Sequence, residues 1–193
     1  VIPFDNKGAD EDVFYAYGIS SDLIGDISSS GKIRVAGLKE IEELGDIPFK
    51  EKAIQLNVRY VSTGLLWKMG EMFQLSIELH DTKENTIIWS DRWQEKWENL
   101  TTIKEKLSSS LLEALNTKPK LAPSFINNNS EAYEYYLKAK YKIEKQEKPE
   151  DFTIGIELVE KAMDLDDDLI EAKLLRIRIY GIKGEFKEFV KLS

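Results

Sequence analysis

The chain has 193 residues, of which 42% are hydrophobic and 32% charged, a composition typical of globular proteins that bury a core. This length fits one large domain or two small ones, and we expect two. The net charge of -8 disfavours nucleic acid and anionic membrane surfaces as partners. No apolar run approaches the roughly 18 residues that span a membrane, and no signal-peptide pattern opens the chain. The absence of cysteine excludes disulfides, thiolate nucleophiles and cysteine-ligated zinc.

The first third of the chain alternates short apolar runs with helical patterns. Residues 1–4 predict a buried strand, which ends at the turn formers of residues 5–8. After Gly18, a capping serine at position 20 or 21 predicts a helix that continues to Ser29. Residues 33–35 then predict a second strand, and residues 48–57 a short amphipathic helix after a less regular stretch.

From residue 58 the hydrophobic period changes from 3.6 to 2, which indicates strands. Three antiparallel strands are expected over residues 58–67, 72–79 and 86–93, with hairpin turns between them. A long amphipathic helix follows from Leu100 to a stop at residues 118–119. Two prolines and three asparagines then mark residues 119–130 as a linker, and residues 131–193 are helical throughout.

Two stretches near the start carry a family resemblance. The segments IPFDN at residues 2–6 and FYAYGISSDLI at 14–24 resemble the opening of the TolB-amino-terminal-like domain. Residues 57–64, 70–81 and 89–93 are similar to later landmarks of that domain, in the same order. The resemblance therefore covers about residues 1–118 and implies an α/β domain with a mixed sheet.

The helical part resembles tetratricopeptide repeats, which are two-helix units of 34 residues. Ala139 in the first helix and Gly155, Leu158 and Ala162 in the second fit the large and small positions of that repeat. Tyr180, together with Gly184 and Phe186, fits a second, truncated unit. The resemblance implies one full repeat and part of another over residues 131–193, in a chain that we interpret as a fragment.

In proteins that this chain resembles, such a pair of domains lies beside a class III adenylate or guanylate cyclase or a CadC-like transcription regulator in bacteria. The resemblance thus implies a non-catalytic fragment for sensing or scaffolding, which couples a bound protein or small ligand to an output domain. The alternative is a cell-envelope scaffold like the flagellar outer-membrane relatives of the same domain. The compartment stays open, with the cytoplasm favoured over the periplasm, and a homodimer is a further option.

Four polar or small residues near the start form a candidate ligand site in the α/β domain. Asp5 and Asn6 follow the first strand, and Gly18 and Ser20 lie at the expected start of the helix. Crevices at such positions bind polar ligands through backbone N–H groups. Helix capping and turn closure explain the same four residues without a ligand.

No other pattern indicates catalysis, a cofactor or a metal site. Glycine-rich phosphate loops are absent, and the aspartates of residues 164–168 lack the spacing of a calcium loop. The single histidine, His80, ends a strand beside Asp81, which leaves an acid/base role using His80, Asp81 or Asp5 as a rival hypothesis. An exposed turn histidine is the favoured interpretation, because one imidazole without clustered ligands makes neither a triad nor a zinc site.

The remaining candidates concern partner binding. Trp89 and Trp93 fall on one face of a strand and are expected in the core, whereas Trp97 is the candidate exposed aromatic. In tetratricopeptide repeats the partner lies in the groove lined by each unit's first helix. By position, this groove is expected to present aromatic and basic side chains to an acidic or extended peptide: Tyr133, Tyr136, Lys140, Lys173 and Arg178.

Overall fold

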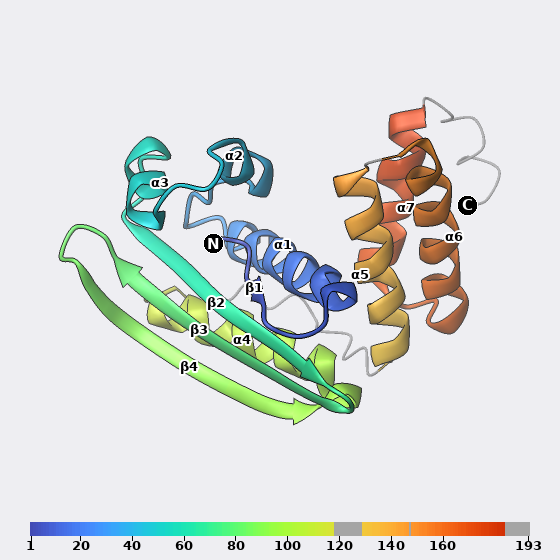
Figure 1. Cartoon of the computed structure of the whole chain (residues 1–193), viewed down its shortest axis with the longest axis horizontal. Helices are drawn as coiled ribbons and strands as arrows, with labels where there is room; N and C mark the ends of the chain where they lie inside the picture. The colour runs from blue at the N-terminus through green and yellow to red at the C-terminus, as the bar shows by residue number, and fades with distance from the viewer. Residues whose placement is uncertain (118–128, 147, 184–193) are drawn as a thin grey trace. The chain divides into compact units, whose positions relative to one another are not determined.

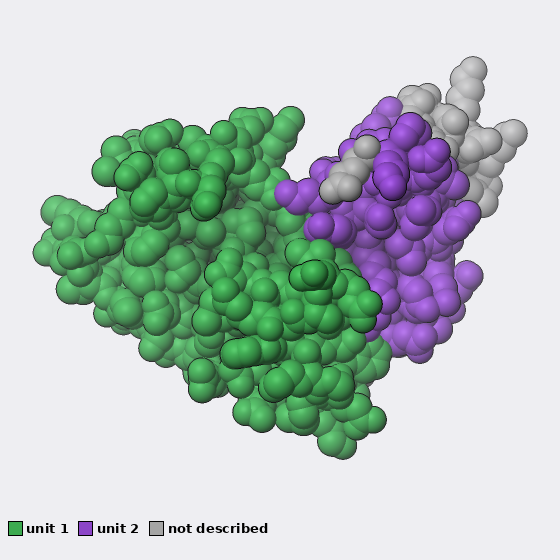
Figure 2. All heavy atoms as spheres, viewed as in Figure 1, with its two compact units in different colours: residues 1–124 green, residues 125–193 purple. Residues whose placement is uncertain are grey.

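The computed structural model describes residues 1–117, 129–146 and 148–183, which fall into two compact units, residues 1–124 and 125–193 (Figure 2). The first unit contains a four-stranded mixed sheet in the order β1-β2-β3-β4, with helices α1 to α4 (Figure 1). The second unit is helical in its described part. The expected class, a mixed-sheet α/β fold followed by helices, is confirmed.

The strands β2 (Tyr60–Met69), β3 (Met72–Asp81) and β4 (Thr86–Lys96) form the antiparallel meander that the period-2 pattern predicts. Each strand extends two or three residues beyond its expected end. The two hairpin turns place Gly70 and Asn85 in the left-handed region, at φ 58° and 56°. Short turns of this kind fix the register, so the alternating apolar residues of β3 all face the core.

Strand β1 (Asp5–Asn6) pairs parallel to β2, with Asp5 opposite Leu65. The expected strand over residues 1–4 is therefore displaced, although the N–H of Ile2 donates to the carbonyl of Ser62. Phe4 is buried, and its ring lies against Gly64 of β2. A side chain at position 64 would occupy the space of this ring, which explains glycine inside a strand.

Helix α1 (Val13–Ser29) follows a 3-10 turn, η1 (Asp10–Asp12), and begins seven residues before the expected start at Ser20. The physical reason is burial on all sides: residues 14–20 of this helix are all buried, so its first turns show no amphipathic period. Gly18 and Ser20 consequently lie inside the helix and not at its start.

Residues 33–35 form no strand, contrary to expectation, and the backbone there is irregular. Helices α2 (Leu38–Glu43) and α3 (Phe49–Gln55) follow it, and Asn57 ends the second of them with φ 51° as expected. A second 3-10 turn, η2 (Trp97–Asn99), leads from β4 into helix α4 (Leu100–Ala114). This helix ends before left-handed Asn116 and not at residues 118–119.

The core of the first unit lies on one face of the sheet, the inner face, which α1 and α4 cover. The largest fully buried side chains come from β2, β3, α1, α2 and α4: Tyr15, Ile19, Leu23, Ile41, Leu66, Phe73, Leu75, Ile77, Leu79, Leu100, Ile103 and Leu107. The ring of Tyr15 lies edge-on to that of Phe73, with centroids 5.5 Å apart. Residues on the opposite, outer face of β2 and β3 alternate with these core positions.

The described part of the second unit consists of α5 (Ser130–Lys145), α6 (Pro149–Leu165) and α7 (Ile170–Lys183). Helices α5 and α6 pack closely at Gly155, where an added Cβ would lie 2.5 Å from Ile143. Ala139 and Ala162 are fully buried as expected, whereas Val159 and not Leu158 is the buried large residue of α6. The expected linker, residues 119–130, lies almost wholly outside the described residues, as do Gly184 and Phe186 of the expected second repeat.

Candidate functional site

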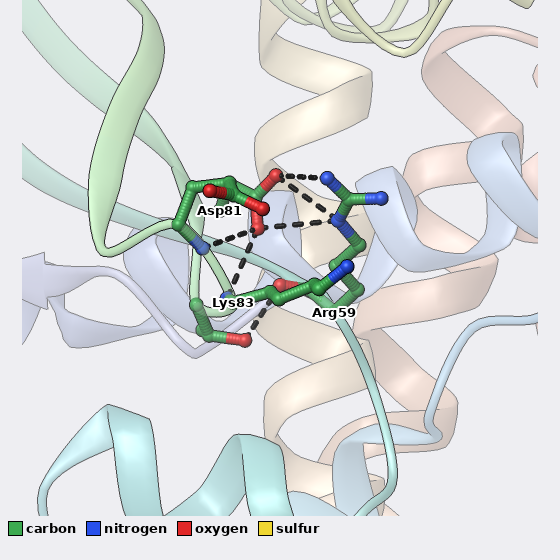
Figure 3. A network of polar contacts seen from close by, with 5 residues as sticks. Arg59, Asp81 and Lys83 are labelled. Carbon is green, nitrogen blue, oxygen red and sulfur yellow. Dashed lines mark hydrogen bonds and ion pairs between the residues drawn. The ribbon is translucent and has the colours of Figure 1, made fainter.

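A network of polar contacts lies at the end of β3, where the chain turns into β4 (Figure 3). The Asp81 carboxylate accepts hydrogen bonds from Arg59 at 2.7 and 3.0 Å and from the backbone N–H groups of Lys83 and Glu84. These bonds hold the pKa of Asp81 below its usual value and raise that of Arg59, in both cases mainly through the side-chain bond between the two. A carboxylate so fully engaged is suited to fixing the turn and is a poor proton acceptor.

On the outer face of the sheet lies a hollow of about 450 Å³, which we call the outer-face hollow. Its floor is formed by β2 and β3, and its walls by the start of the chain and the segment that leads into α3. Its volume lies within the range typical of ligand pockets. Its lining includes apolar, aromatic and charged side chains. Among them are Pro3, Asp5, Asp46, Ile47, Phe49, Lys52, Thr63, Leu65, Glu78 and His80.

His80 lies in this hollow, where its side chain is 15% exposed. Its ring lies against that of Phe49, with centroids 4.7 Å apart. The ring nitrogen Nε2 is 3.1 Å from Thr63 Oγ1 and 3.2 Å from Glu78 Oε2. The histidine that we expected to be exposed in a turn is therefore largely buried within a strand, where Phe49 of α3 lies against it.

The contacts of His80 differ from those of a catalytic relay. In a nucleophile–histidine–carboxylate triad the carboxylate bonds one ring nitrogen and the nucleophile the other. Here the Thr63 hydroxyl and the Glu78 carboxylate both approach Nε2. This geometry lets the imidazole bridge two neighbouring strand residues, but it does not line up a proton path through the ring.

Next to the hollow, the outer face of β2 carries three exposed apolar side chains in alternate positions. Leu65, Trp67 and Met69 are 42%, 40% and 56% exposed. We call them the outer row. Leu65 also lines the outer-face hollow, so the two features are continuous. These residues were not among the candidates singled out from the sequence, although the period-2 spacing of Leu65 and Trp67 places them on one face.

A second cavity, of about 210 Å³, lies at the sheet edge between residues 33–36 and the first half of β2. Its lining is mainly aliphatic, and Val1 and Ile2 contribute to it. The hydroxyl of Ser62, which also lines it, is buried without a hydrogen-bond partner.

The structure separates the four residues of the expected ligand site. Asp5 lines the outer-face hollow, and Asn6 closes a turn by accepting from the N–H of Gly8 and donating to the carbonyl of Ala9. Ser20 is buried, where its hydroxyl donates to the carbonyl of Ala16 and accepts from the N–H of Phe4. Gly18 is buried inside α1. Of the four, Asp5 alone lines a described hollow.

The expected groove residues divide into two groups. Tyr133, Tyr136 and Lys140 of α5 are buried, and Lys140 Nζ donates to the Tyr136 hydroxyl at 3.3 Å. Lys173 and Arg178 of α7 are partly exposed and form ion pairs with Asp167 and Glu144, at 3.4 and 2.6 Å. Binding of a partner by these five residues remains a prediction.

Other candidates from the sequence have structural roles. Trp97 donates from Nε1 to the hydroxyl of Tyr15 at 2.9 Å and is only partly exposed, so it does not form an open aromatic platform. Trp89 and Trp93 lie opposite the core residues Leu79 and Leu75 of β3 but are half-buried, so they are not core residues as expected. No group of three or more acidic or imidazole side chains in the described ranges is arranged to hold a metal ion. None of the described helices is long and apolar enough to cross a bilayer.

Comparisons with known proteins found similarity to solved structures alone. No family profile and no curated protein matches the sequence. Similar structures include a PelC variant dodecamer from Paraburkholderia phytofirmans, with 19% identity and a TM-score of 0.42, over 59% of this chain and 84% of that one. TolB from Acinetobacter baumannii has 13% identity and a TM-score of 0.42, over 60% of this chain. The chain spans 28% of that TolB.

Lipoprotein GNA1162 from Neisseria meningitidis is also similar, with 14% identity and a TM-score of 0.43, over 60% of this chain and 94% of that one. The similar structures thus include a TolB protein, the family that the motifs of residues 2–6 and 14–24 resemble. The tetratricopeptide assignment of residues 131–193 stays a prediction.

Proposed function

We propose that this chain is a non-catalytic binding module whose α/β unit holds a protein partner on the outer face of its sheet. The observation that carries the proposal is the outer row of Leu65, Trp67 and Met69, which stays exposed beside a hollow of about 450 Å³. Apolar side chains exposed in a contiguous group, next to a concave site with polar groups, are typical of interaction surfaces.

The composition of the outer row supports a protein partner. Tryptophan and methionine are enriched at the centres of protein interfaces, where a rigid aromatic side chain buries a large area at low entropic cost. The facing residue of β3, Met72, lies opposite Met69 and continues the apolar surface across the hairpin. Next to this apolar surface, β3 and β4 carry polar residues such as Gln74, Gln94 and Lys96, as expected at the rim of an interface.

The contacts of His80 and Asp81 support the non-catalytic part of the proposal. Both polar neighbours of His80 approach the same ring nitrogen, and Asp81 is committed to Arg59 and two backbone N–H groups. We expect the purified chain to show no turnover of nucleotides or phosphoesters. Turnover that disappears in Asp5→Ala or His80→Ala would overturn this part.

On the wider role, we propose that the module couples its bound partner to a separate output domain, such as a cyclase or a transcription regulator. The helices α5 to α7 would supply a second contact surface. The alternative is a cell-envelope scaffold, and the similar structures include a lipoprotein and a PelC dodecamer. The proposed binding surface is the same in both cases.

The experiment is a selection of binders from a displayed random-peptide library, with the whole chain as bait. Recovered peptides are then measured against three variants by isothermal calorimetry. Leu65→Ser and Trp67→Ser remove outer-row contacts and should each weaken binding about tenfold or more, because removal of an interface anchor costs roughly 2 kcal/mol. Ile54→Ser is the matched control, because Ile54 on α3 is even more exposed, at 78%, and lines neither cavity.

Equal binding to all three variants and the natural chain would show that the outer row is not the binding surface. A chain that sediments as a dimer, and becomes monomeric in the Trp67→Ser variant, would also contradict the proposal, because a second copy would then cover the row.

A further inference from the structure

The outer-face hollow has a two-part lining that indicates the chemistry of what it binds. One part is apolar, from Pro3, Ile47, Leu65 and the ring of Phe49. The other part is charged and lies on the same walls and floor. A ligand that fits both must carry a charged group on an apolar stem, as the side chains of lysine and arginine do.

The sign of the charge is set by three carboxylates, those of Asp5, Asp46 and Glu78, against the single ammonium of Lys52. Lys7 lies 3.3 Å from Asp5 but does not line the hollow. The net charge of -8 of the whole chain adds a negative background. A concave site with this balance raises the local concentration of cations.

The aromatic wall favours an organic cation over a metal ion. Phe49 lies against His80 with its ring at the hollow, where a guanidinium or ammonium group gains from the ring quadrupole. In the described part of the chain, no group of three acidic or imidazole side chains is arranged to hold a metal ion. The carboxylates are thus spread around the hollow and not gathered at one point.

Leu65 connects the hollow to the outer row, because its side chain belongs to both. A partner that covers Trp67 and Met69 therefore brings neighbouring residues over the hollow. Alternate residues of an extended segment point to the same side at a spacing of about 7 Å. We infer that the outer-face hollow receives a lysine or arginine side chain of the partner polypeptide. This inference rests on the proposed function of the outer face.

The experiment uses end-blocked pentapeptides Leu-Gly-X-Gly-Leu, in which X is arginine or citrulline and the leucines lie two residues away on the same side. Citrulline has nearly the same shape as arginine but no charge. Binding to the whole chain is followed by NMR at two signals: the imidazole C–H of His80, which is the chain's single histidine, and the indole N–H of Trp67, assigned with a Trp67→Phe variant. We expect saturable shifts of both signals with the arginine peptide and binding at least fivefold weaker with citrulline.

Two variants test the role of the carboxylates. Asp46→Asn and Glu78→Gln should each weaken the binding of the arginine peptide about threefold to fivefold, which is the effect expected from the loss of a partly exposed ion pair. Asp46→Asn leaves the surroundings of the His80 reporter intact. Glu43→Gln in α2 removes an exposed carboxylate outside the hollow and should change the affinity less than twofold, about the limit for a distant screened charge.

Three results would overturn the inference. Equal affinity for the arginine and citrulline peptides would mean that the charge is not recognised. Shifts of Trp67 without shifts of His80 would place the peptide on the outer row and outside the hollow. In both cases the proposed function survives, whereas an absence of shifts at both residues would count against the outer face as a whole.

Discussion

Arg59, which precedes β2, and Asp81, the last residue of β3, are joined by a two-pronged ion pair, with Arg59 Nη2 2.7 Å and Nε 3.0 Å from Asp81 Oδ2 (Figure 3). Asp81 is almost fully buried, whereas Arg59 is half exposed. The pair fastens the two strands at the end where the hairpin turn of residues 82–85 begins. Because the same carboxylate also accepts from two turn N–H groups, it connects the strand pair to the turn.

Removing one member of this pair should destabilise the first unit. We expect Asp81→Asn to lower the thermal midpoint by several degrees, because an amide cannot accept all the bonds that the carboxylate accepts. Tryptophan fluorescence reports this unit, since all four tryptophans lie between residues 67 and 97. Lys39→Ala, which removes a fully exposed ion pair with Glu43, should leave the midpoint within about one degree. Equal midpoints for both variants would contradict the assigned role of Asp81.

The same pair predicts a dependence of stability on pH. The pKa of Asp81 is lower in the folded protein than in the unfolded chain, chiefly because of the Arg59 hydrogen bond. The carboxylate therefore contributes its full stabilisation above the unfolded-state pKa of about 4 and loses it as the pH falls through the lower folded-state pKa. In urea titrations, the difference between the natural chain and Asp81→Asn should be constant near neutrality and shrink in strong acid. A difference that grows on acidification would have the wrong sign.

Glycine at position 64 is predicted to be required for packing. A Cβ there would lie 2.6 Å from the Phe4 ring and 2.9 Å from the carbonyl oxygen of Ser76. Gly64→Ala should therefore cost about 1 to 3 kcal/mol in unfolding free energy, as overpacking does. Phe4→Leu in the Gly64→Ala background should restore part of the loss, because the contact with the Ser76 backbone persists.

Gly25 supplies the matched control for this substitution. It lies in helix α1, and a Cβ there would meet nothing within 4 Å. Gly25→Ala should leave the unfolding free energy unchanged or raise it by up to about 1 kcal/mol, since alanine favours the helix. If both alanine variants behave alike, the close approach of Phe4 to β2 is not what selects glycine.

Charge reversal at Lys140 and at Arg178 should have different effects on the stability of the helical unit, although the sequence suggested the same role for both residues. Lys140 is 9% exposed, so Lys140→Glu places a carboxylate in a buried position next to the Tyr136 ring and should destabilise the helices. Arg178 is more than half exposed, and Arg178→Glu should have a much smaller effect. Hydrogen exchange of α5 amides measures the difference. Similar protection in both variants would contradict the burial of Lys140.

The period-2 pattern of residues 58–97 predicted the meander because one face of each strand is buried, so apolar and polar side chains alternate. The same reasoning failed for α1, where Tyr15 and Ile19 lie on a helix that is buried on several sides and shows no polar stripe at its start. It also failed for residues 33–35, since pairing with a neighbouring strand depends on tertiary context that local pattern does not contain.

The outer-face hollow was predictable only in pieces. The sequence singled out Asp5 for a ligand site and named Asp5 and His80 as alternatives for an acid/base role, but it did not predict that both line one hollow. Their meeting depends on the parallel pairing of β1 with β2 and on Phe49 reaching back over β3. Contacts between segments that are separated by tens of residues follow from topology, and a single sequence carries little information about them.

Phe4 links the two faces of the sheet. Its ring is packed on the inner face against Gly64, while the residues on either side of it, Pro3 and Asp5, form a wall of the outer-face hollow. Because β1 has only two residues, the position of that wall depends largely on how the Phe4 ring packs. Substitutions that shift Phe4 on the inner face of the sheet are therefore expected to change which ligands the outer-face hollow binds, even when every residue that contacts the ligand is unchanged.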